Sequence, residues 1–426
     1  MIWRALYTLV LRGLAPLILL RLWWRGLREP GYRRHVAERF GYYRDTMRGR
    51  GGTLTERPML WLHAVSVGEA RASAGLVRAL ARARPEFGIV VTCMTAAGRE
   101  TLKELHGESV QVAWLPYDYP GAVRRFLERY RPFLAVLVET ELWPNLLAGC
   151  ASFGVPVLLA NARMSEKSAA GYRRLGVLAR PALGALALAC AQSEEDAVRL
   201  RSLGARRVEV AGNLKFDSAP DAAKAAAGRA WRERLGRPVL LLASTRDGEE
   251  KLLLEALPPW DGKLLVLVVP RHPRRFDEVA AFSQSRRSRG EIPGSQDRVY
   301  LGDTMGEMDF YYAAADVAVI GGSFQPLGGQ NLIEACAAGV PVVLGPSMFN
   351  FAEATRLAVG AGAAVRAQDA ADAVGKALQL LSNPGERSRM GAAGRALCQA
   401  HRGATRRHVE YCGELLRSGA KAPARR

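Results

Sequence analysis

The first residue along the chain that is suited to chemistry is a carboxylate that follows a short apolar run. Residues 59–64 are mostly aliphatic or aromatic, which is typical of a buried parallel strand, and residues 66–68 predict a tight turn into a helix. Glu69 follows at that turn. Ligands of open α/β sheets bind beyond the carboxyl ends of the strands, so Glu69 stands where chemistry can take place. A carboxylate that only complements the helix dipole is the alternative, and spacing alone does not decide between these roles.

Two more carboxylates follow the predicted strand 134–138. Glu139 and Glu141 are two residues apart, which places both on one side of an extended segment. A metal pair and an ionic brace of the loop both fit this spacing, although no histidine or Asp-x-Asp triplet supports a metal.

Cationic side chains follow two further predicted strands of the first half. Arg163 follows the run 155–160, and Lys215 follows the run 207–211. The ends of four predicted strands thus offer charged side chains to one cleft: Glu69, Glu139, Arg163 and Lys215.

The second half of the chain offers groups suited to phosphate. Arg271 and His272 directly follow the predicted strand 264–269, where a guanidinium can hold a phosphate through two hydrogen bonds. A structural ion pair of Arg271 is the alternative. Glycines and backbone N–H groups then recur in GDTMGE (302–307) and in GGSFQPLGGQNLIEA (321–335). Three such loops at strand ends of one domain predict a nucleotide site.

The acidic residue of the last loop suggests a different contact. Asn331 is expected to cap a helix that carries Glu334 in its first turn. A negative charge repels phosphate, so we interpret Glu334 as an acceptor for a ribose hydroxyl.

Alternating apolar runs and helical stretches must position these side chains. The predicted strands are 59–64, 89–95, 134–138, 155–160, 185–191 and 207–211 in the first half, and 238–243, 264–269, 317–320 and 341–344 in the second. Helical stretches such as 70–83 and 120–130 separate them. This alternation predicts an α/β fold with a parallel sheet in each half, and two Rossmann-like domains facing a cleft are the simplest arrangement.

Composition agrees with two domains. The 426 residues exceed the roughly 250–300 at which a single core stops growing. The net charge of +19 indicates an anionic partner such as phosphate, anionic lipid or nucleic acid. Six scattered cysteines predict neither a disulfide framework nor a zinc site and fit a reducing cytoplasm. Cys93, Cys190 and Cys336 lie in apolar runs and are expected to be buried.

The first 28 residues have the pattern of an amphipathic helix. Apolar residues recur every three or four positions, at Leu6, Val10, Leu14, Leu17, Leu20, Trp24 and Leu27. Arginines interrupt the segment, so its uncharged runs are far shorter than the ~20 residues that span a bilayer. Pro16 is expected to kink or restart the helix.

The N-terminal segment also contains more basic than acidic residues. Residues 1–50 hold eleven arginines and three acids, a net charge of +8. This charge, together with the tryptophans at positions 3, 23 and 24, favours a helix lying on an anionic membrane surface. A helix whose apolar stripe packs on its own domain is the alternative.

Eight motifs, in order, resemble those of the 3-deoxy-D-manno-oct-2-ulosonic acid (Kdo) transferases of lipopolysaccharide synthesis. They are HAVSVGE (63–69), LPYDYP (115–120), VETELWPN (138–145), NARMSEKSAAGY (161–172), GNLKFD (212–217), PRHPRRF (270–276), GDTMGE (302–307) and GGSFQPLGGQNLIEA (321–335). The resemblance extends over roughly residues 5–400 and is more specific than any single glycine loop.

The resemblance implies an inverting glycosyltransferase of the GT-B type that moves Kdo from CMP-Kdo to a lipid A precursor, lipid IVA. It implies a place at the cytoplasmic side of the inner membrane, peripheral or held by the N-terminal segment. It implies no metal or other cofactor, because CMP-Kdo is a substrate. The implied segments are a membrane-associating segment, an acceptor-binding domain, a linker, a nucleotide-sugar-binding domain and a C-terminal helix with a basic tail: 1–50, 51–216, 217–232, 233–400 and 401–426.

The resemblance also implies roles for single residues. Glu69 would be the general base, while Glu139 and Lys215 would help to stabilise the transition state. The residues that would hold the CMP of the donor are Arg271, His272, Met305, Gly306, Glu307, Asn331, Leu332, Ile333 and Glu334.

Two positions depart from the expected motifs. Gln330 stands where a histidine is common, and Thr245-Arg246-Asp247 replaces a run like Thr-His-Glu, which leaves the donor contacts there open. A GT-B glycosyltransferase or an epimerase that uses another nucleotide sugar is the alternative function. A nucleic-acid-binding protein is disfavoured, because the excess charge concentrates in the amphipathic start of the chain.

Overall fold

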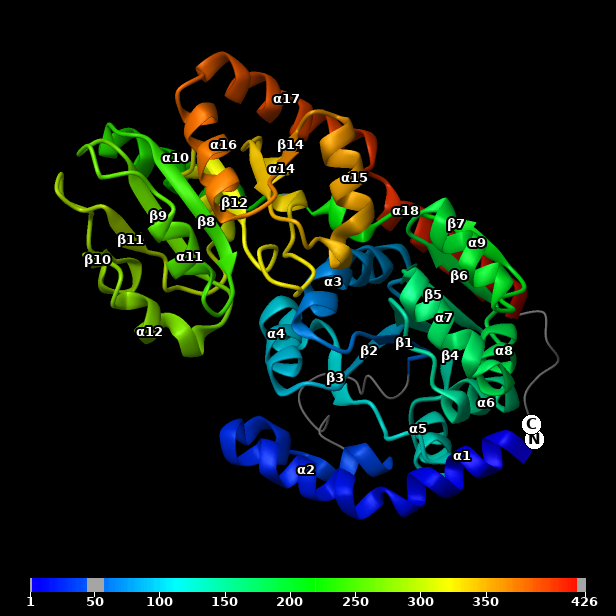
Figure 1. Cartoon of the computed structure of the whole chain (residues 1–426). Helices are drawn as coiled ribbons and strands as arrows, with labels where there is room; N and C mark the ends of the chain where they lie inside the picture. Colours follow the sequence, from blue (N-terminus) through cyan, green and yellow to red (C-terminus); the bar gives the residue numbers. More distant parts are fainter. Residues whose placement is uncertain (1, 44–56, 219, 420–426) are drawn as a thin grey trace. The chain divides into compact units, whose positions relative to one another are not determined.

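The computed structural model describes residues 2–43, 57–218 and 220–419 (Figure 1). The chain divides into two compact units, Met1–Asp217 with Arg402–Arg426, and Ser218–His401. The predicted boundary at 50/51 and residues 420–426 of the predicted tail lie outside the described residues.

The first unit contains a parallel sheet of seven described strands, in the order β3-β2-β1-β4-β5-β6-β7. The strands are β1 (Met59–His63), β2 (Gly88–Cys93), β3 (Gln111–Trp114), β4 (Pro132–Val138), β5 (Val157–Ala162), β6 (Leu188–Ala191) and β7 (Val208–Val210). The helices are α3 (Val67–Ala83), α4 (Ala96–His106), α5 (Pro120–Tyr130), α6 (Pro144–Ser152), α7 (Glu166–Arg174), α8 (Gly176–Gly184), α9 (Glu194–Ser202) and α18 (Ala404–Gly419). Short 3₁₀ turns are η1 (Pro30–Arg33), η2 (Val36–Phe40), η4 (Gly107–Ser109) and η5 (Leu214–Asp217).

Helices cover both faces of this sheet because the central strands are apolar on both sides. In β1, Met59 and Trp61 belong to one buried cluster, which also holds side chains of α5, α6 and α9. Leu60 and Leu62 belong to the other, with side chains of α3, α4 and α18. The near-continuous apolar runs of the sequence reflect this two-sided burial.

The second unit contains another parallel sheet of seven described strands, in the order β10-β11-β9-β8-β12-β13-β14. They are β8 (Val239–Thr245), β9 (Leu265–Pro270), β10 (Ser285–Arg286), β11 (Val299–Leu301), β12 (Val317–Ile320), β13 (Val342–Leu344) and β14 (Ala364–Arg366). The helices are α10 (Ala222–Leu235), α11 (Glu249–Glu255), α12 (Phe276–Ala280), α13 (Met308–Ala313), α14 (Ile333–Ala338), α15 (Ala352–Gly360), α16 (Ala370–Leu381) and α17 (Pro384–Ala400), and the 3₁₀ turns are η6 (Pro273–Arg275), η7 (Arg287–Arg289) and η8 (Phe349–Phe351).

The predicted α/β class with a parallel sheet in each half is confirmed, and all ten predicted strands are present with ends shifted by up to three residues. Four strands were missed: β3, β10, β11 and β14. Three of them are sheet edges, and none exceeds four residues. The stretch 217–232, predicted as linker and helix, contains most of α10, which continues to Leu235 and packs on α13. Gly228 permits this contact, since a Cβ there would lie 2.3 Å from the Phe310 carbonyl oxygen.

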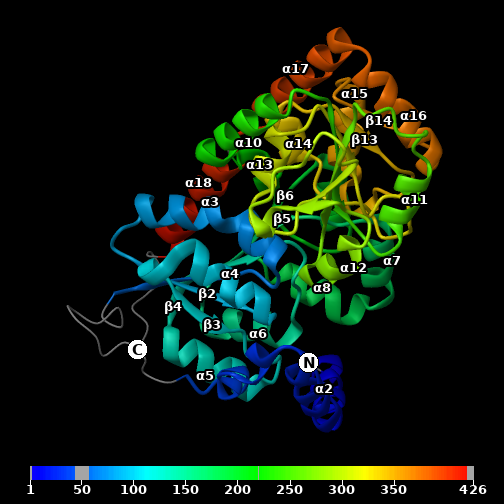
Figure 2. The same cartoon turned by 90° about the vertical axis from the view of Figure 1, so that its left-hand side faces the viewer.

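All six cysteines are free and buried, as expected for Cys93, Cys190 and Cys336. The predicted N-terminal helix is also present, as α1 (Ile2–Gly13) and α2 (Ala15–Arg28). The two are bent by 51°, and Pro16 lies in the first turn of α2, as predicted. Figures 1 and 2 show both helices lying along the outside of the first unit.

Polar contacts hold α1 to the first unit while its apolar stripe stays exposed. The Thr8 hydroxyl is buried against Asn145, and the Tyr119 hydroxyl donates to the Leu11 carbonyl. The seven residues of the predicted stripe are all at least two-fifths exposed. Among the described residues no single helix has the length and apolar composition to cross a membrane; α1 and α2 meet that test only as a bent pair.

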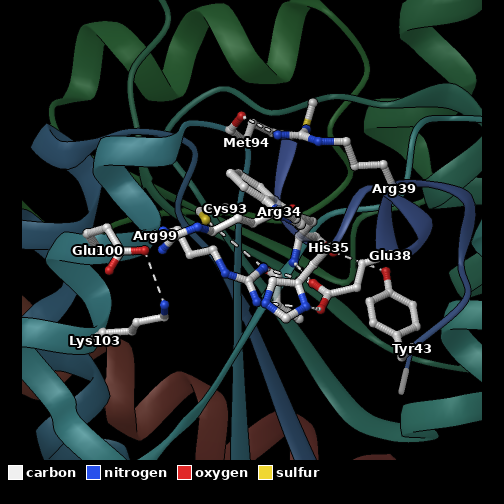
Figure 3. Close-up of polar contacts among 12 residues, drawn as sticks. Arg34, His35, Glu38, Arg39, Tyr43, Cys93, Met94, Arg99, Glu100 and Lys103 are labelled. Carbon is white, nitrogen blue, oxygen red and sulfur yellow. Dashed lines mark hydrogen bonds and ion pairs between the residues drawn. The ribbon is translucent and has the colours of Figure 1, made fainter. Parts of the chain in front are cut away.

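A buried ion pair attaches the segment after α2 to the sheet (Figure 3). The Glu38 carboxylate on η2 accepts hydrogen bonds from the Arg99 guanidinium, the shorter at 2.8 Å, and from the Trp114 backbone N–H at 2.9 Å. Arg39 is also buried, with its guanidinium 3.8 Å from the centre of the Trp114 ring and bonded to the Met94 carbonyl. Residues 30–40 are therefore part of the folded unit.

We predict that Glu38→Gln lowers the stability of the first unit by about 3 kcal/mol, because it leaves the buried Arg99 guanidinium without its charged partner. Thermal unfolding followed by circular dichroism measures the effect. Glu128→Gln, which removes the exposed ion pair with Arg124, is the control and should leave the transition unchanged. Equal transitions for the two variants would contradict the prediction.

Candidate active site

The first turn of α3 holds Glu69 in a defined position. One carboxylate oxygen accepts the Val65 backbone N–H at 2.6 Å, and the other accepts the Ser66 hydroxyl at 3.1 Å. These contacts resemble a helix cap, in which a carboxylate reaches back to N–H groups that lack partners in the helix. The carboxylate is thus fixed at the carboxyl end of β1.

The electrostatics of Glu69 differ from those of a simple cap. Burial raises the pKa of Glu69 to about 8, and the nearby charges of Glu139 and Glu141 add to the shift. A carboxylate that only complemented a helix dipole would be favoured in its charged form, and its pKa would fall. The carboxyl group of Glu69 is therefore a stronger base than an ordinary one once it is ionised, and the ionised share grows as the pH approaches 8.

Glu139 and Lys215 meet at the carboxyl ends of β4 and β7. The Lys215 ammonium lies 3.6 Å from a carboxylate oxygen of Glu139. Glu139 has a φ of 64°, which is rare for a residue with a side chain, and its N–H donates to the Ala160 carbonyl at 2.8 Å. The structure thus brings together Glu69, Glu139 and Lys215, three of the four charged residues predicted to meet in the first half.

The fourth, Arg163, follows β5 directly. Its carbonyl oxygen accepts the hydroxyl of Thr140, which ties the loop after β5 to the loop after β4. Glu141 also belongs to this group: its carboxylate accepts the Trp143 indole N–H at 2.8 Å. Burial raises the pKa of Glu141 to about 7, and the charge of Glu139 adds to the shift.

A network of hydrogen bonds holds the backbone at Lys215 in place. The Asn161 side chain accepts the Leu214 N–H, and the Asn213 side chain accepts the Lys215 N–H, both at 3.0 Å. Gln192 links the two asparagines. The Asn161 N–H in turn donates at 3.0 Å to the imidazole of His408 on α18. Burial lowers the pKa of His408 to about 4, so its ring is neutral and accepts this bond.

In the second unit, the predicted donor residues follow three strands of one sheet. Residues 305–307 come after β11, Arg271 with His272 after β9, and residues 331–334 after β12. Strand β8 lies between β9 and β12, and its carboxyl end carries Arg246, a departure from the family motifs. The register pairs Thr245 with Pro270, and the Arg271 N–H donates to the Thr245 carbonyl at 2.9 Å. One edge of the sheet therefore gathers all the predicted donor residues.

Arg271 and His272 form the centre of this edge. The Arg271 Nε donates to the Gln330 side-chain oxygen at 3.3 Å, so one of the two departures from the family motifs contacts a predicted phosphate ligand. Burial and the positive charges of Arg271, Arg246 and Arg274 lower the pKa of His272. His272 is therefore a neutral hydrogen-bonding group near neutral pH.

A buried carboxylate that the sequence did not reveal holds the glycine-rich loop. Glu249, in the first turn of α11, accepts the N–H groups of Arg246 at 2.9 Å, Gly322 at 2.6 Å and Phe324 at 3.0 Å. The end of β8 and the loop after β12 are thus bound to one side chain.

The turn 305–307 precedes α13. The Gly306 carbonyl accepts the Lys224 ammonium at 2.9 Å, and the Glu307 carboxylate pairs with Arg287 at 3.0 Å. Hydrogen bonds from Arg287 lower the pKa of Glu307, with a further contribution from Thr304. Met305 is half-exposed.

The start of α14 differs slightly from the predicted cap. The N-cap residue is Leu332, and the Asn331 side chain, one position earlier, accepts the Ile333 N–H at 3.1 Å. The Asn331 amide also donates to the Glu334 carboxylate at 3.0 Å. Asn331 thus orients Glu334. Among residues 2–43, 57–218 and 220–419, no group of three or more His, Cys, Asp or Glu residues is placed to hold a metal ion.

Comparisons with known proteins agree with this geometry. The family model "3-Deoxy-D-manno-octulosonic-acid transferase (kdotransferase)" matches residues 34–218, and "Glycosyl transferases group 1" matches residues 294–397. The 3-deoxy-D-manno-octulosonic acid transferase of Bordetella pertussis is 48% identical over 97% of this chain and 99% of its own. The chain belongs to the Kdo transferase family.

Other relatives of this Kdo transferase extend the comparison. The enzyme of the same name from Haemophilus influenzae is 35% identical over 97% of this chain and 99% of its own. The solved structure of Anabaena Alr3699/HepE in complex with UDP is 16% identical, with a TM-score of 0.59, and covers 85% of this chain and all of its own. That likeness supports the GT-B-type fold alone. The enzyme is a glycosyltransferase that transfers Kdo in lipopolysaccharide biosynthesis.

We predict that Glu69→Gln stabilises this Kdo transferase increasingly as the pH rises from 5 to 8.5. Because the pKa of Glu69 is raised, the folded chain retains a proton there that the unfolded chain releases above its ordinary pKa. Folding stability from this group is therefore lost as the pH rises toward about 8, and glutamine cannot lose a proton. Thermal unfolding midpoints of wild type and variant across this range measure the difference.

Glu166→Gln, at an exposed carboxylate in the first turn of α7, gives the baseline for the loss of one negative charge. If Glu69→Gln and Glu166→Gln change the unfolding midpoint by the same amount at every pH, burial does not perturb the pKa of Glu69.

Proposed function

We propose that the enzyme transfers Kdo from CMP-Kdo to the lipid A precursor lipid IVA with inversion at the anomeric carbon. The observation that most supports this proposal is the buried carboxylate of Glu69 at the end of β1, whose pKa is raised to about 8. Transfer of a sugar to a hydroxyl with inversion needs one such base within reach of the acceptor.

The proposed reaction proceeds by a single displacement. An acceptor hydroxyl oxygen attacks the anomeric carbon of Kdo while the bond from that carbon to the phosphate oxygen breaks. The hydroxyl proton passes to Glu69, and CMP leaves with the bonding electron pair. The Lys215 ammonium stabilises the negative charge that gathers on the leaving group, and Glu139 helps through its ion pair with Lys215.

The donor is proposed to lie along the carboxyl edge of the second sheet. Arg271, the neutral His272 and the backbone of the glycine-rich loop offset the charge of the leaving phosphate. Glu334, oriented by Asn331, accepts a ribose hydroxyl. Residues 305–307 and 332–333 complete the proposed contacts with CMP.

A membrane location is proposed from α1 and α2. Their large apolar side chains are exposed: Leu17 is 61% and Leu20 60% accessible. Arginines of the same helices would meet anionic headgroups, while Trp23 and Trp24 would lie at the interface. We propose that these helices lie on the cytoplasmic side of the inner membrane, together with the proposed lipid acceptor. Nucleic acid is not an expected partner.

We predict that Glu69→Gln lowers turnover by about 10²–10⁴-fold, the usual contribution of a general base, and leaves the affinity for CMP within about threefold. The rise of kcat/KM with pH that the pKa of Glu69 causes in the wild type should also disappear. Release of CMP from CMP-Kdo with lipid IVA, and the product mass, report the reaction.

Glu166→Gln, at an exposed glutamate, is the control and should turn over normally. Near-normal turnover of Glu69→Gln would remove Glu69 from the role of base. A wild-type enzyme that consumes a UDP-sugar in place of CMP-Kdo would contradict the proposed donor.

For the membrane, we predict that the double variant Leu17→Glu, Leu20→Glu lowers binding to vesicles that contain an anionic phospholipid by about 10-fold or more. Burying each leucine contributes roughly 1.5–3 kcal/mol, and a glutamate at the same position repels the anionic surface. Vesicle flotation of the purified protein measures the bound fraction.

Ile292→Glu is the matched control, since Ile292 is an equally exposed apolar residue of the second unit. Unchanged flotation of the double variant would contradict a membrane role for this stripe.

A further inference from the structure

The backbone at the end of β8 is irregular just before Arg246. The register between β8 and β9 shifts between Ala243 and Thr245, and the intervening Ser244 has a φ of 57°. Such bulges redirect the following side chains and are common next to active sites. Gly321, directly after β12, allows the bulge, because a Cβ there would lie 2.5 Å from the Thr245 Cα. Arg246 is the next residue after this rearranged backbone.

Arg246 and Arg271 occupy equivalent positions on neighbouring strands. Thr245 of β8 and Pro270 of β9 are the last residues that pair between the two strands. Arg246 directly follows Thr245, and Arg271 directly follows Pro270. Adjacent strands lie about 4.8 Å apart, so the backbones of the two arginines leave the sheet edge side by side. The charges of both residues act on His272, where they help to lower the pKa of the imidazole.

The acidic residues near Arg246 are engaged elsewhere. Glu249 accepts three backbone N–H groups, among them that of Arg246 itself. Glu250 is bound by Arg275 and Thr245, and Asp247 pairs with Arg275 at 2.7 Å. The Nε of Arg246 is buried and has no hydrogen-bond partner in the part of the chain that the structure describes.

The donor of the proposed function carries two anionic groups on one carbon. Kdo is a 2-keto sugar acid, so its anomeric carbon bears both the carboxylate and, in CMP-Kdo, the phosphate oxygen. Two adjacent cations at the sheet edge match this pair of anions. A donor sugar without a carboxylate offers only its phosphates to the same two residues.

We propose that Arg246 binds the carboxylate of the donor sugar, while Arg271 holds the phosphate beside it. This subsite rests on the proposed donor and adds a residue that determines specificity for an acidic sugar. Arg246 stands where the family motif has a histidine. A guanidinium is charged at every relevant pH and can bind a carboxylate through two hydrogen bonds, which an imidazole cannot.

The test compares the KM for CMP-Kdo with the inhibition constant of CMP, which lacks the sugar and its carboxylate. For Arg246→Ala we expect the KM to rise about 10–100-fold and the inhibition constant of CMP to change less than about threefold. Arg246→Lys, which keeps the charge, should recover part of the loss. Lys263→Ala removes an exposed cation just before β9, at the other end of that strand from Arg271, and should leave both constants within about threefold of wild type.

Two outcomes would overturn the subsite. Equal weakening of CMP-Kdo and CMP by Arg246→Ala would assign Arg246 to the phosphate, and unchanged constants would remove it from the donor site. Arg246→Gln repeats the comparison with a longer polar side chain should the alanine variant fold poorly. A wild-type enzyme that does not consume CMP-Kdo would overturn the proposed function and the subsite together, whereas an active wild type with an unaffected variant overturns the subsite alone.

Discussion

The desolvation of one carboxylate constrains the whole first unit. Glu69 receives hydrogen bonds from Val65 and Ser66 that favour its charged form, yet burial and two neighbouring glutamates raise its pKa to about 8. A group that is both fixed in place and reluctant to ionise is difficult to build, because the fold must supply the hydrogen bonds and withhold water at once. The apolar strands, the first turn of α3 and the loop after β4 all serve that condition.

Strained backbone recurs where the chain leaves its central strands. Glu139 follows β4, Asn161 lies near the end of β5 and Ser244 near the end of β8, and all three have positive φ. Such conformations cost of order 1–3 kcal/mol each and persist only where surrounding contacts impose them. Here those contacts are visible: Asn161 is held by His408 and Leu214, and the bulge at Ser244 rests on Gly321. Each strained residue lies next to side chains of the proposed sites.

Much of the fold and of the candidate site could be predicted from the sequence because both depend on long apolar strands and on the residues just beyond their ends. Glu69, Glu139, Lys215 and Arg271 each come within about six residues of a strand end, so their positions could be inferred from the strands. Short edge strands such as β3 gave no pattern, since pairing with a neighbour rather than their own composition defines them.

Contacts between distant parts of the chain gave even less signal. Glu249 looks like an ordinary acid in a first helical turn, and only the fold shows that it binds the loop at Gly322. The sequence around His408 likewise gives no sign that its imidazole accepts a hydrogen bond from Asn161, 247 positions away.

The path of the chain has a consequence for how the enzyme is made. The second unit is inserted into the first, whose last helix, α18, is also the last element described before the chain ends. Asp217, just before the insertion, accepts the N–H groups of Gly403 and Thr405 just after it, and α18 supplies His408 to the network behind Lys215. A ribosome synthesises these residues only after the entire second unit. The strands of the first sheet therefore emerge first, yet the edge that carries Glu139 and Lys215 is completed last. A chain released early lacks the contacts that hold the segment around Lys215 in place.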